Sequence, residues 1–160
     1  MTLFLRRDNS AGAARFTVYD SMGFVKYYVC SSSSGVTSRL VITASEYPGD
    51  RCAKIRRLPG INTASYILRA GKGYITLVCV LSPAAFYAKI YGKNWHISGD
   101  MRSKCFDVHD VDNTLIMRQT YKNHSSELYI EDEANEMYCV MLSVCSNLIN
   151  TVEKTAVAAV

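Results

Sequence analysis

Glycines recur at nearly regular intervals over the first hundred residues, and this spacing constrains the fold more than any other feature. They stand at positions 12, 23, 35, 49, 60, 71, 73, 92 and 99, and most are 11–14 residues apart. The runs between them alternate between apolar and polar side chains, as where Phe16 and Val18 share one face and Arg15 takes the other. Short alternating runs separated by turn residues are typical of strands. The chain therefore predicts an all-β sandwich or barrel.

The alternation places about twelve strands in the first 132 residues. Half of the residues are apolar and a fifth are charged, which excludes a disordered chain and supports one domain over residues 1–160. The strands are predicted near 2–6, 15–20, 24–30, 37–44, 50–57, 63–69, 73–80, 85–91, 94–98, 104–109, 113–119 and 126–132.

The segment from about 134 to 150 differs from everything before it. It contains neither glycine nor proline, and the core of this segment, from Met137 to Ile149, carries no charge. Asp132 is suited to cap a helix that begins there. A helix that is apolar on all sides has to be buried on all sides. We expect a central core helix, with a frayed tail over 153–160. A membrane anchor is the alternative, although about 13 uncharged residues fall short of the roughly 20 that span a bilayer.

The six cysteines at 30, 52, 79, 105, 139 and 145 predict no disulfide framework and no zinc site. They stand in apolar runs without paired Cys-x-x-Cys spacing, where free cysteine behaves as a small buried hydrophobe. We expect no secretory leader, because the first five residues are too short for its apolar region and charges follow them at once. We therefore expect reduced thiols in a cytoplasmic protein, peripheral to a membrane at most, with neither cofactor nor metal.

A cationic strand is the feature that most resembles a site. No acidic residue lies between Arg51 and Gly99, whereas eight cations do. Alternation turns Ala53 and Ile55 inward, which sends Lys54 and Arg56 to the surface, with Arg57 at the strand end. Arg69 and Lys72 lie one predicted hairpin away. Two or three such cations on one face can hold a phosphate, since arginine binds it bidentately. The alternative is a solvated edge, where Lys and Arg serve solubility.

Other chemistry has weaker support. Cys105 lies near His96, Asp100 and His109 in sequence, but no nucleophile-elbow pattern surrounds it. Asp110, Asp112 and Asn113 fit a β-turn better than a calcium loop. Nucleic acid is not expected as a partner, because exposed aromatics interleaved with cations are not evident along the chain.

Four segments stand in a distinctive order before the final helix, namely Phe16-Thr-Val-Tyr-Asp20, Arg39-Leu-Val-Ile42, Ile90-Tyr-Gly-Lys-Asn-Trp-His-Ile-Ser-Gly-Asp100 and Phe106-Asp-Val-His-Asp110. With these segments and this order of elements, the chain resembles the tubby C-terminal-like superfamily, and within it the LURP-one-related family, in a bacterial-type single-domain form. The resemblance runs from about Arg15 to Val152.

The resemblance implies a closed barrel of twelve antiparallel strands threaded by a hydrophobic helix. It also implies a non-enzymatic binding or scaffold protein, since tubby proteins bind phosphoinositide head groups. We expect an anionic phospholipid head group at Lys54, Arg56, Arg57, Arg69 and Lys72. The alternatives are a cytosolic protein–protein interaction module without lipid binding and, more remotely, a cysteine-dependent enzyme.

Overall fold

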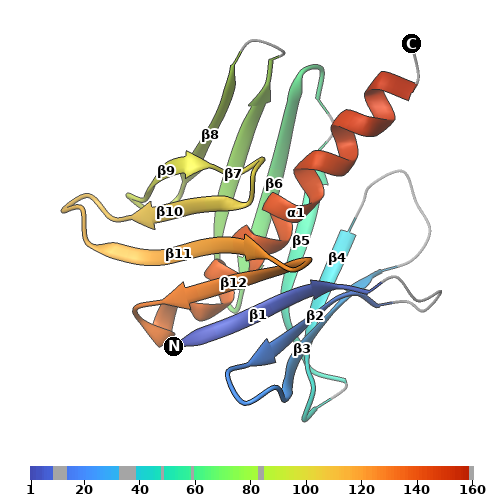
Figure 1. The fold of residues 1–160 in the computed structure, drawn as a ribbon, viewed down its shortest axis with the longest axis vertical. Coiled ribbons are helices and arrows are strands. Elements are labelled where there is room, and N and C mark those ends of the chain that lie inside the picture. The colour runs from blue at the N-terminus through green and yellow to red at the C-terminus, as the bar shows by residue number, and fades with distance from the viewer. Residues whose placement is uncertain (9–13, 33–38, 48, 59, 83–84, 159–160) are drawn as a thin grey trace.

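The computed structural model confirms a mainly β fold in which twelve antiparallel strands form a nearly closed barrel around one C-terminal helix (Figure 1). The structure describes residues 1–8, 14–32, 39–47, 49–58, 60–82 and 85–158. The strands are β1 (Thr2–Arg7), β2 (Ala14–Asp20), β3 (Val25–Ser31), β4 (Arg39–Ala44), β5 (Arg51–Leu58), β6 (Thr63–Ala70), β7 (Gly73–Leu81), β8 (Phe86–Tyr91), β9 (His96–Asp100), β10 (Cys105–His109), β11 (Leu115–Lys122) and β12 (Ser125–Ile130).

Consecutive strands pair with one another except β8 and β9, and the first strand also pairs with the last. The order around the wall is β8-β7-β6-β5-β4-β3-β2-β1-β12-β11-β10-β9. The pairing of Leu3 with Leu128 joins β1 to β12. The two end strands β8 and β9 lie in contact but are not hydrogen-bonded neighbours in this order. Among the described strands, the barrel is therefore open only along this seam.

The inner face of the wall is apolar, as the alternation predicts. Phe16 and Val18 of β2 are buried, as are Phe106 and Val108 of β10. Because side chains alternate between the two faces of a strand, the intervening residues face outward. The interior of the barrel is thereby lined with branched and aromatic side chains that have to be covered from within.

The helix α1 (Glu136–Ala158) supplies that cover, following the short 3₁₀ helix η1 (Glu133–Asn135). Figure 1 shows it running through the space that the strands enclose. Every residue from Cys139 to Asn147 is buried, which confirms the central core helix. Asp132 caps η1, where its side chain accepts from the Ala134 N–H at 2.9 Å. No helix in the described part of the chain is long and apolar enough to cross a bilayer.

The helix is longer than the sequence predicts, because it continues to Ala158 through most of the segment expected to fray. This segment holds neither glycine nor proline. Alanine, glutamate and lysine favour a helix, so no local signal ends it.

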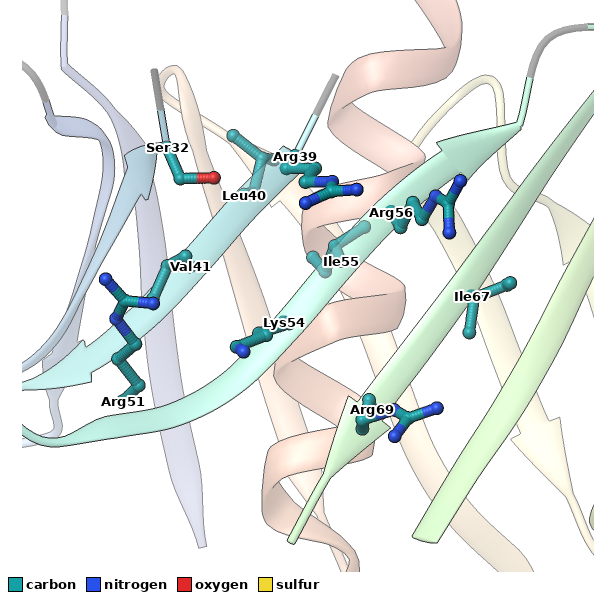
Figure 2. A pocket seen from close by; sticks show the side chains of 10 residues that line it. All are labelled: Ser32, Arg39, Leu40, Val41, Arg51, Lys54, Ile55, Arg56, Ile67 and Arg69. Carbon is teal, nitrogen blue, oxygen red and sulfur yellow. The ribbon is translucent and has the colours of Figure 1, made fainter. Parts of the chain in front are cut away.

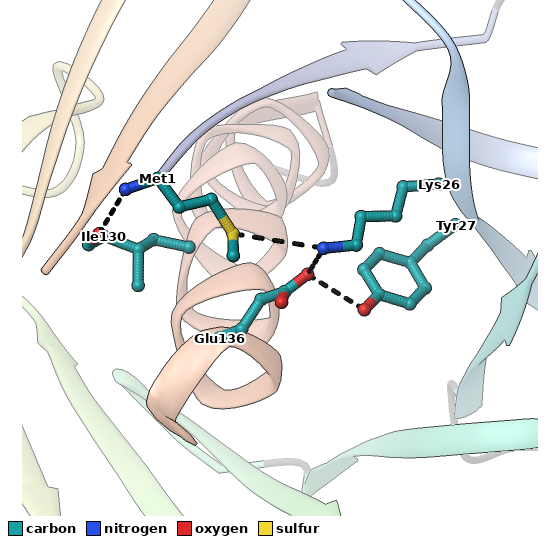
Figure 3. Close-up of polar contacts among 5 residues, drawn as sticks. All are labelled: Met1, Lys26, Tyr27, Ile130 and Glu136. Atoms are coloured by element: carbon teal, nitrogen blue, oxygen red, sulfur yellow. Dashed lines mark hydrogen bonds and ion pairs between the residues drawn. The ribbon is translucent and has the colours of Figure 1, made fainter. Parts of the chain in front are cut away.

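A polar cluster fastens the beginning of α1 to the wall (Figure 3). The Glu136 carboxylate forms an ion pair with the Lys26 ammonium group at 2.7 Å. It also accepts a hydrogen bond from the Tyr27 hydroxyl at 2.8 Å. The amino group of Met1 donates to the Ile130 carbonyl at 2.9 Å, next to the start of the helix. The carboxylate satisfies two donors of β3 in a partly buried setting, and this fixes where the helix enters the barrel.

Candidate functional site

Cations from three neighbouring strands meet on the outer face of the barrel. Lys54 of β5 lies opposite Arg69 of β6 and opposite Val41 of β4. Arg56 lies opposite Arg39 of β4. Residues directly opposite one another in an antiparallel pair present their side chains on the same face, about 5 Å apart. The register therefore gathers cations that are far apart in the chain.

These side chains surround a surface cavity of about 330 Å³, which we call the basic pocket (Figure 2). Its five cations are Arg39, Arg51, Lys54, Arg56 and Arg69. Arg51 joins the others because a bulge shifts the β4–β5 register next to Ile42 and places Arg51 opposite Thr43. A bulge re-aims side chains in this way.

The floor of the basic pocket is apolar. Val41 faces outward by its place in β4, yet only 8% of it is exposed. Figure 2 shows the Arg51 side chain lying beside Val41. Long cationic side chains cover apolar surface with their aliphatic stems and leave their charged heads in water. The arrangement therefore keeps the guanidinium and ammonium groups available at the surface.

Among the described residues, no carboxylate forms an ion pair with a cation of the basic pocket. Strands β4 to β8 contain no acidic residue at all. The ion pairs that the described residues form involve Lys26, Arg102 and Arg118, none of which lines the pocket. Like charges directly opposite one another in a sheet cost a few tenths to about 1 kcal/mol. A bound anion would relieve this repulsion.

The structure brings together three of the five predicted site residues, namely Lys54, Arg56 and Arg69. Arg57 faces the other side of β5 opposite buried Tyr66, and its Nε atom is buried without a hydrogen-bond partner. Lys72 is exposed in the β6–β7 turn and does not line the basic pocket.

Sequence reasoning missed Arg39 and Arg51 as site residues. The outward direction of Arg39 could have been predicted, because it alternates with Leu40 and Ile42, which are buried. The alternation does not show which strand pairs with β4, so it could not place Arg39 beside Arg56. Arg51 depends on the bulge, for which the residues on either side give no evident signal.

The region of Cys105 has no paired nucleophile and base. Cys105 is exposed and lies opposite Asp100, at the far end of β10 from His109. The two histidines His96 and His109 lie opposite each other instead, with stacked rings 5.5 Å apart. No histidine therefore lies across from the thiol within the ladder.

Asp107 and Asp110 have structural partners. Arg118 donates twice to Asp107, at 2.8 and 2.9 Å, and this hydrogen bonding lowers the pKa of the carboxyl group. Asp110 accepts from the N–H groups of Asp112 and Thr114, which confirms the predicted Asx turn. Among the described residues, no three His, Cys, Asp or Glu side chains are placed to hold a metal ion.

Comparison with known proteins supports the architecture alone. No protein-family model matches the chain. No curated protein matches it either. The chain is similar to the X-ray structure of an Arabidopsis thaliana protein, AT5G01750, with a TM-score of 0.60 over 92% of this chain and 90% of that one. The sequence identity is 11%, so this similarity shows a shared fold.

Proposed function

We propose that this protein is a non-enzymatic binding module of the LURP-one-related, tubby C-terminal-like type, and that its ligand carries phosphate groups. The observation that supports this proposal is the convergence of five cations around the basic pocket with no carboxylate on the strands that form it. The similarity in fold to the Arabidopsis protein is in keeping with the family resemblance of the sequence.

The composition of the basic pocket favours phosphate over a carboxylate ligand. Four of its five cations are arginines. The guanidinium group donates in a planar fork that matches two phosphate oxygens, and lysine adds a point charge. A phosphate group carries between one and two negative charges near neutral pH. A pocket with five positive charges therefore suits a ligand that has more than one phosphate, or several phosphates presented side by side.

The same chemistry is offered by two sources, which are the head groups of anionic phospholipids and soluble phosphorylated molecules. Vesicle flotation, with phosphatidylserine in phosphatidylcholine against phosphatidylcholine alone, tests the first source. Titration calorimetry with inorganic tripolyphosphate tests the chemistry without a bilayer. A ligand held by the basic pocket binds in a salt-dependent manner, because surface charges are screened within about 10 Å at 0.1 M salt.

The decisive variant is the double charge reversal Lys54→Glu/Arg56→Glu. Its matched control, Arg7→Glu/Lys122→Glu, changes the net charge equally at exposed positions on β1 and β11. We expect the first variant to lose binding at least tenfold and the control to stay within about twofold. Equal losses in both variants would show that binding follows net charge alone and would refute the basic pocket as the site. A protein partner retained by Lys54→Glu/Arg56→Glu would instead favour an interaction module without phosphate binding.

A further inference from the structure

Exposed tyrosines stand beside the cations on the outer wall, in an order that the linear sequence conceals. Tyr74 of β7 and Tyr91 of β8 are 58% and 49% exposed, and Tyr87 of β8 is 58% exposed. Arg69 lies opposite Tyr74 in the β6–β7 ladder. Val41, Lys54 and Arg69 lie opposite one another on β4, β5 and β6 and form a row across the wall. Tyr74 of β7 is the next residue of this row.

A second row runs parallel to the first. Arg39 lies opposite Arg56, and Arg56 lies opposite Ile67. Thr76 follows on β7, and Tyr91 ends the row on β8. Each row therefore begins over the basic pocket and ends on an exposed aromatic ring. We call the surface formed by both rows the tyrosine–cation wall.

Each ring of this wall lies beside a cation, namely Arg69 of the first row for Tyr74, and for Tyr91 the neighbouring Lys89 of β8, which lies outside both rows. The guanidinium carbon of Arg69 lies 5.8 Å from the centre of the Tyr74 ring. The ammonium group of Lys89 lies 5.0 Å from the centre of the Tyr91 ring. Each tyrosine is thus accompanied by a group that can hold a phosphate. This is the combination that binds single strands, where bases stack on aromatic rings and cations follow the backbone.

We propose that the tyrosine–cation wall binds single-stranded nucleic acid. This inference rests on the proposed function, since it names the source of the phosphate groups. The expectation from the sequence was the opposite, because interleaved exposed aromatics were not evident along the chain. They arise only when the antiparallel register aligns β4 to β8.

The shape of the wall favours a flexible strand over a flat bilayer. From β4 to β8 the wall covers four of the twelve steps around the barrel, which is a third of a turn. Neighbouring strands lie about 4.8 Å apart, so the path is about 19 Å long. A plane touches a cylinder along a narrow band, whereas a single strand bends to follow the curve. This path accommodates roughly four nucleotides, at the low end of the site sizes of proteins that bind single strands.

The binding is expected to depend on salt and to tolerate many sequences. Stacking does not distinguish bases strongly, since every base has a π face. Each phosphate contact contributes about −0.7 to the slope of log K against log salt for single strands. Contacts from about four of the wall cations would give a slope of about −3.

Fluorescence anisotropy with a 12-nucleotide labelled oligo(dT) tests this inference, and a 12-base-pair duplex serves as a second probe. The variant Tyr74→Leu/Tyr91→Leu keeps apolar surface but removes the stacking rings, and we expect it to weaken oligo(dT) binding at least tenfold. The variant Tyr74→Phe/Tyr91→Phe keeps the rings and should stay within about twofold. The control Tyr129→Leu changes an exposed tyrosine of β12, which is not part of the wall, and should also stay within twofold.

Cross-linking the unaltered protein to a thiouridine oligonucleotide provides a readout that does not depend on the variants folding. We expect cross-linked peptides that contain Tyr74 or Tyr91. Cross-links confined to other surfaces, or equal affinity of the Leu and wild-type proteins, would overturn the inference. So would binding of the duplex as tight as that of the single strand.

The failure of this inference can be told apart from the failure of the proposed function. Binding of phosphatidylserine vesicles or tripolyphosphate without binding of oligo(dT) overturns the nucleic-acid inference and leaves a phosphate-binding module. Absence of binding to all three probes overturns both.

Discussion

Raising the pH should unfold this protein through thiols that its barrel keeps out of water. Cys79 of β7 and Cys139 of α1 are fully buried, and burial raises the pKa of each thiol to about 12. Cys145 of α1 is also fully buried, and burial raises its pKa well above the ordinary value. A thiol in the unfolded chain ionises near pH 8.5.

The sign of the effect follows from proton counts. Above about pH 8.5 the unfolded chain releases protons that the folded protein retains, so the unfolded state gains stability relative to the folded state. Each buried thiol then lowers the free energy of unfolding by about 1.4 kcal/mol per pH unit until the folded pKa is reached. At pH 10, the raised pKa values of Cys79 and Cys139 together lower the free energy of unfolding by about 4 kcal/mol. That is a large share of the roughly 5–15 kcal/mol that stabilises a typical domain.

Urea unfolding followed by circular dichroism at pH 7.0, 8.5, 9.25 and 10.0, with a phosphine reductant present, measures this dependence. The variant Cys79→Ala/Cys139→Ala should lose about two thirds of the slope, since one buried thiol remains. Any cavity it creates lowers stability equally at every pH and does not affect the slope. Cys105→Ala, on the exposed face of β10, is the matched control. A stability that is constant from pH 7 to 10, or a double variant with the wild-type slope, would refute the reasoning.

Two further predictions concern backbone strain and the anchor of the helix. Gly99 has φ +91°, and an added Cβ would lie 2.9 Å from a carbonyl oxygen of β10, whereas Gly23 has φ +87° and open space around it. Gly23→Ala should therefore lower the free energy of unfolding by about 1–2 kcal/mol, from backbone strain alone. Gly99→Ala should lower it clearly more, because the clash adds to the strain. Urea unfolding measures both losses, and equal losses would contradict the steric argument. Glu136→Gln removes the ion pair with Lys26 and weakens the hydrogen bond from Tyr27, so it should lower stability by about 1 kcal/mol and the melting temperature by about 2–4 °C. The loss should shrink in 1 M NaCl, and an unchanged melting temperature would show that the cluster contributes nothing.

Local patterns were sufficient for the strands and for the core. The burial of Phe106 and Val108 beside exposed Cys105 follows from alternation, because the period of two in a strand is a local property. The buried helix follows from its lack of charge, because an apolar surface on all sides requires cover on all sides. The end of the helix did not follow, since nothing before Ala158 stops it.

The candidate site was only partly predictable, and Arg57 shows why. Its place next to Arg56 suggested a shared surface, yet consecutive residues of one strand face opposite sides, and Arg57 turns toward buried Tyr66. Arg39 lies far away in the chain but directly opposite Arg56. Proximity in sequence and proximity on a face are different properties in a sheet.

By itself, the sequence determined that the chain forms a mainly β fold with a core helix, and which side chains face outward at most strand positions, with Arg51 and Arg57 as exceptions. Only the tertiary structure decided which outward residues become neighbours. Alternation depends on the geometry of one strand, whereas register depends on turns, on the bulge between Arg51 and Ala53 and on closure of the barrel by β1 and β12. The row from Lys54 through Arg69 to Tyr74 exists for this reason, since three strands have to align before it forms.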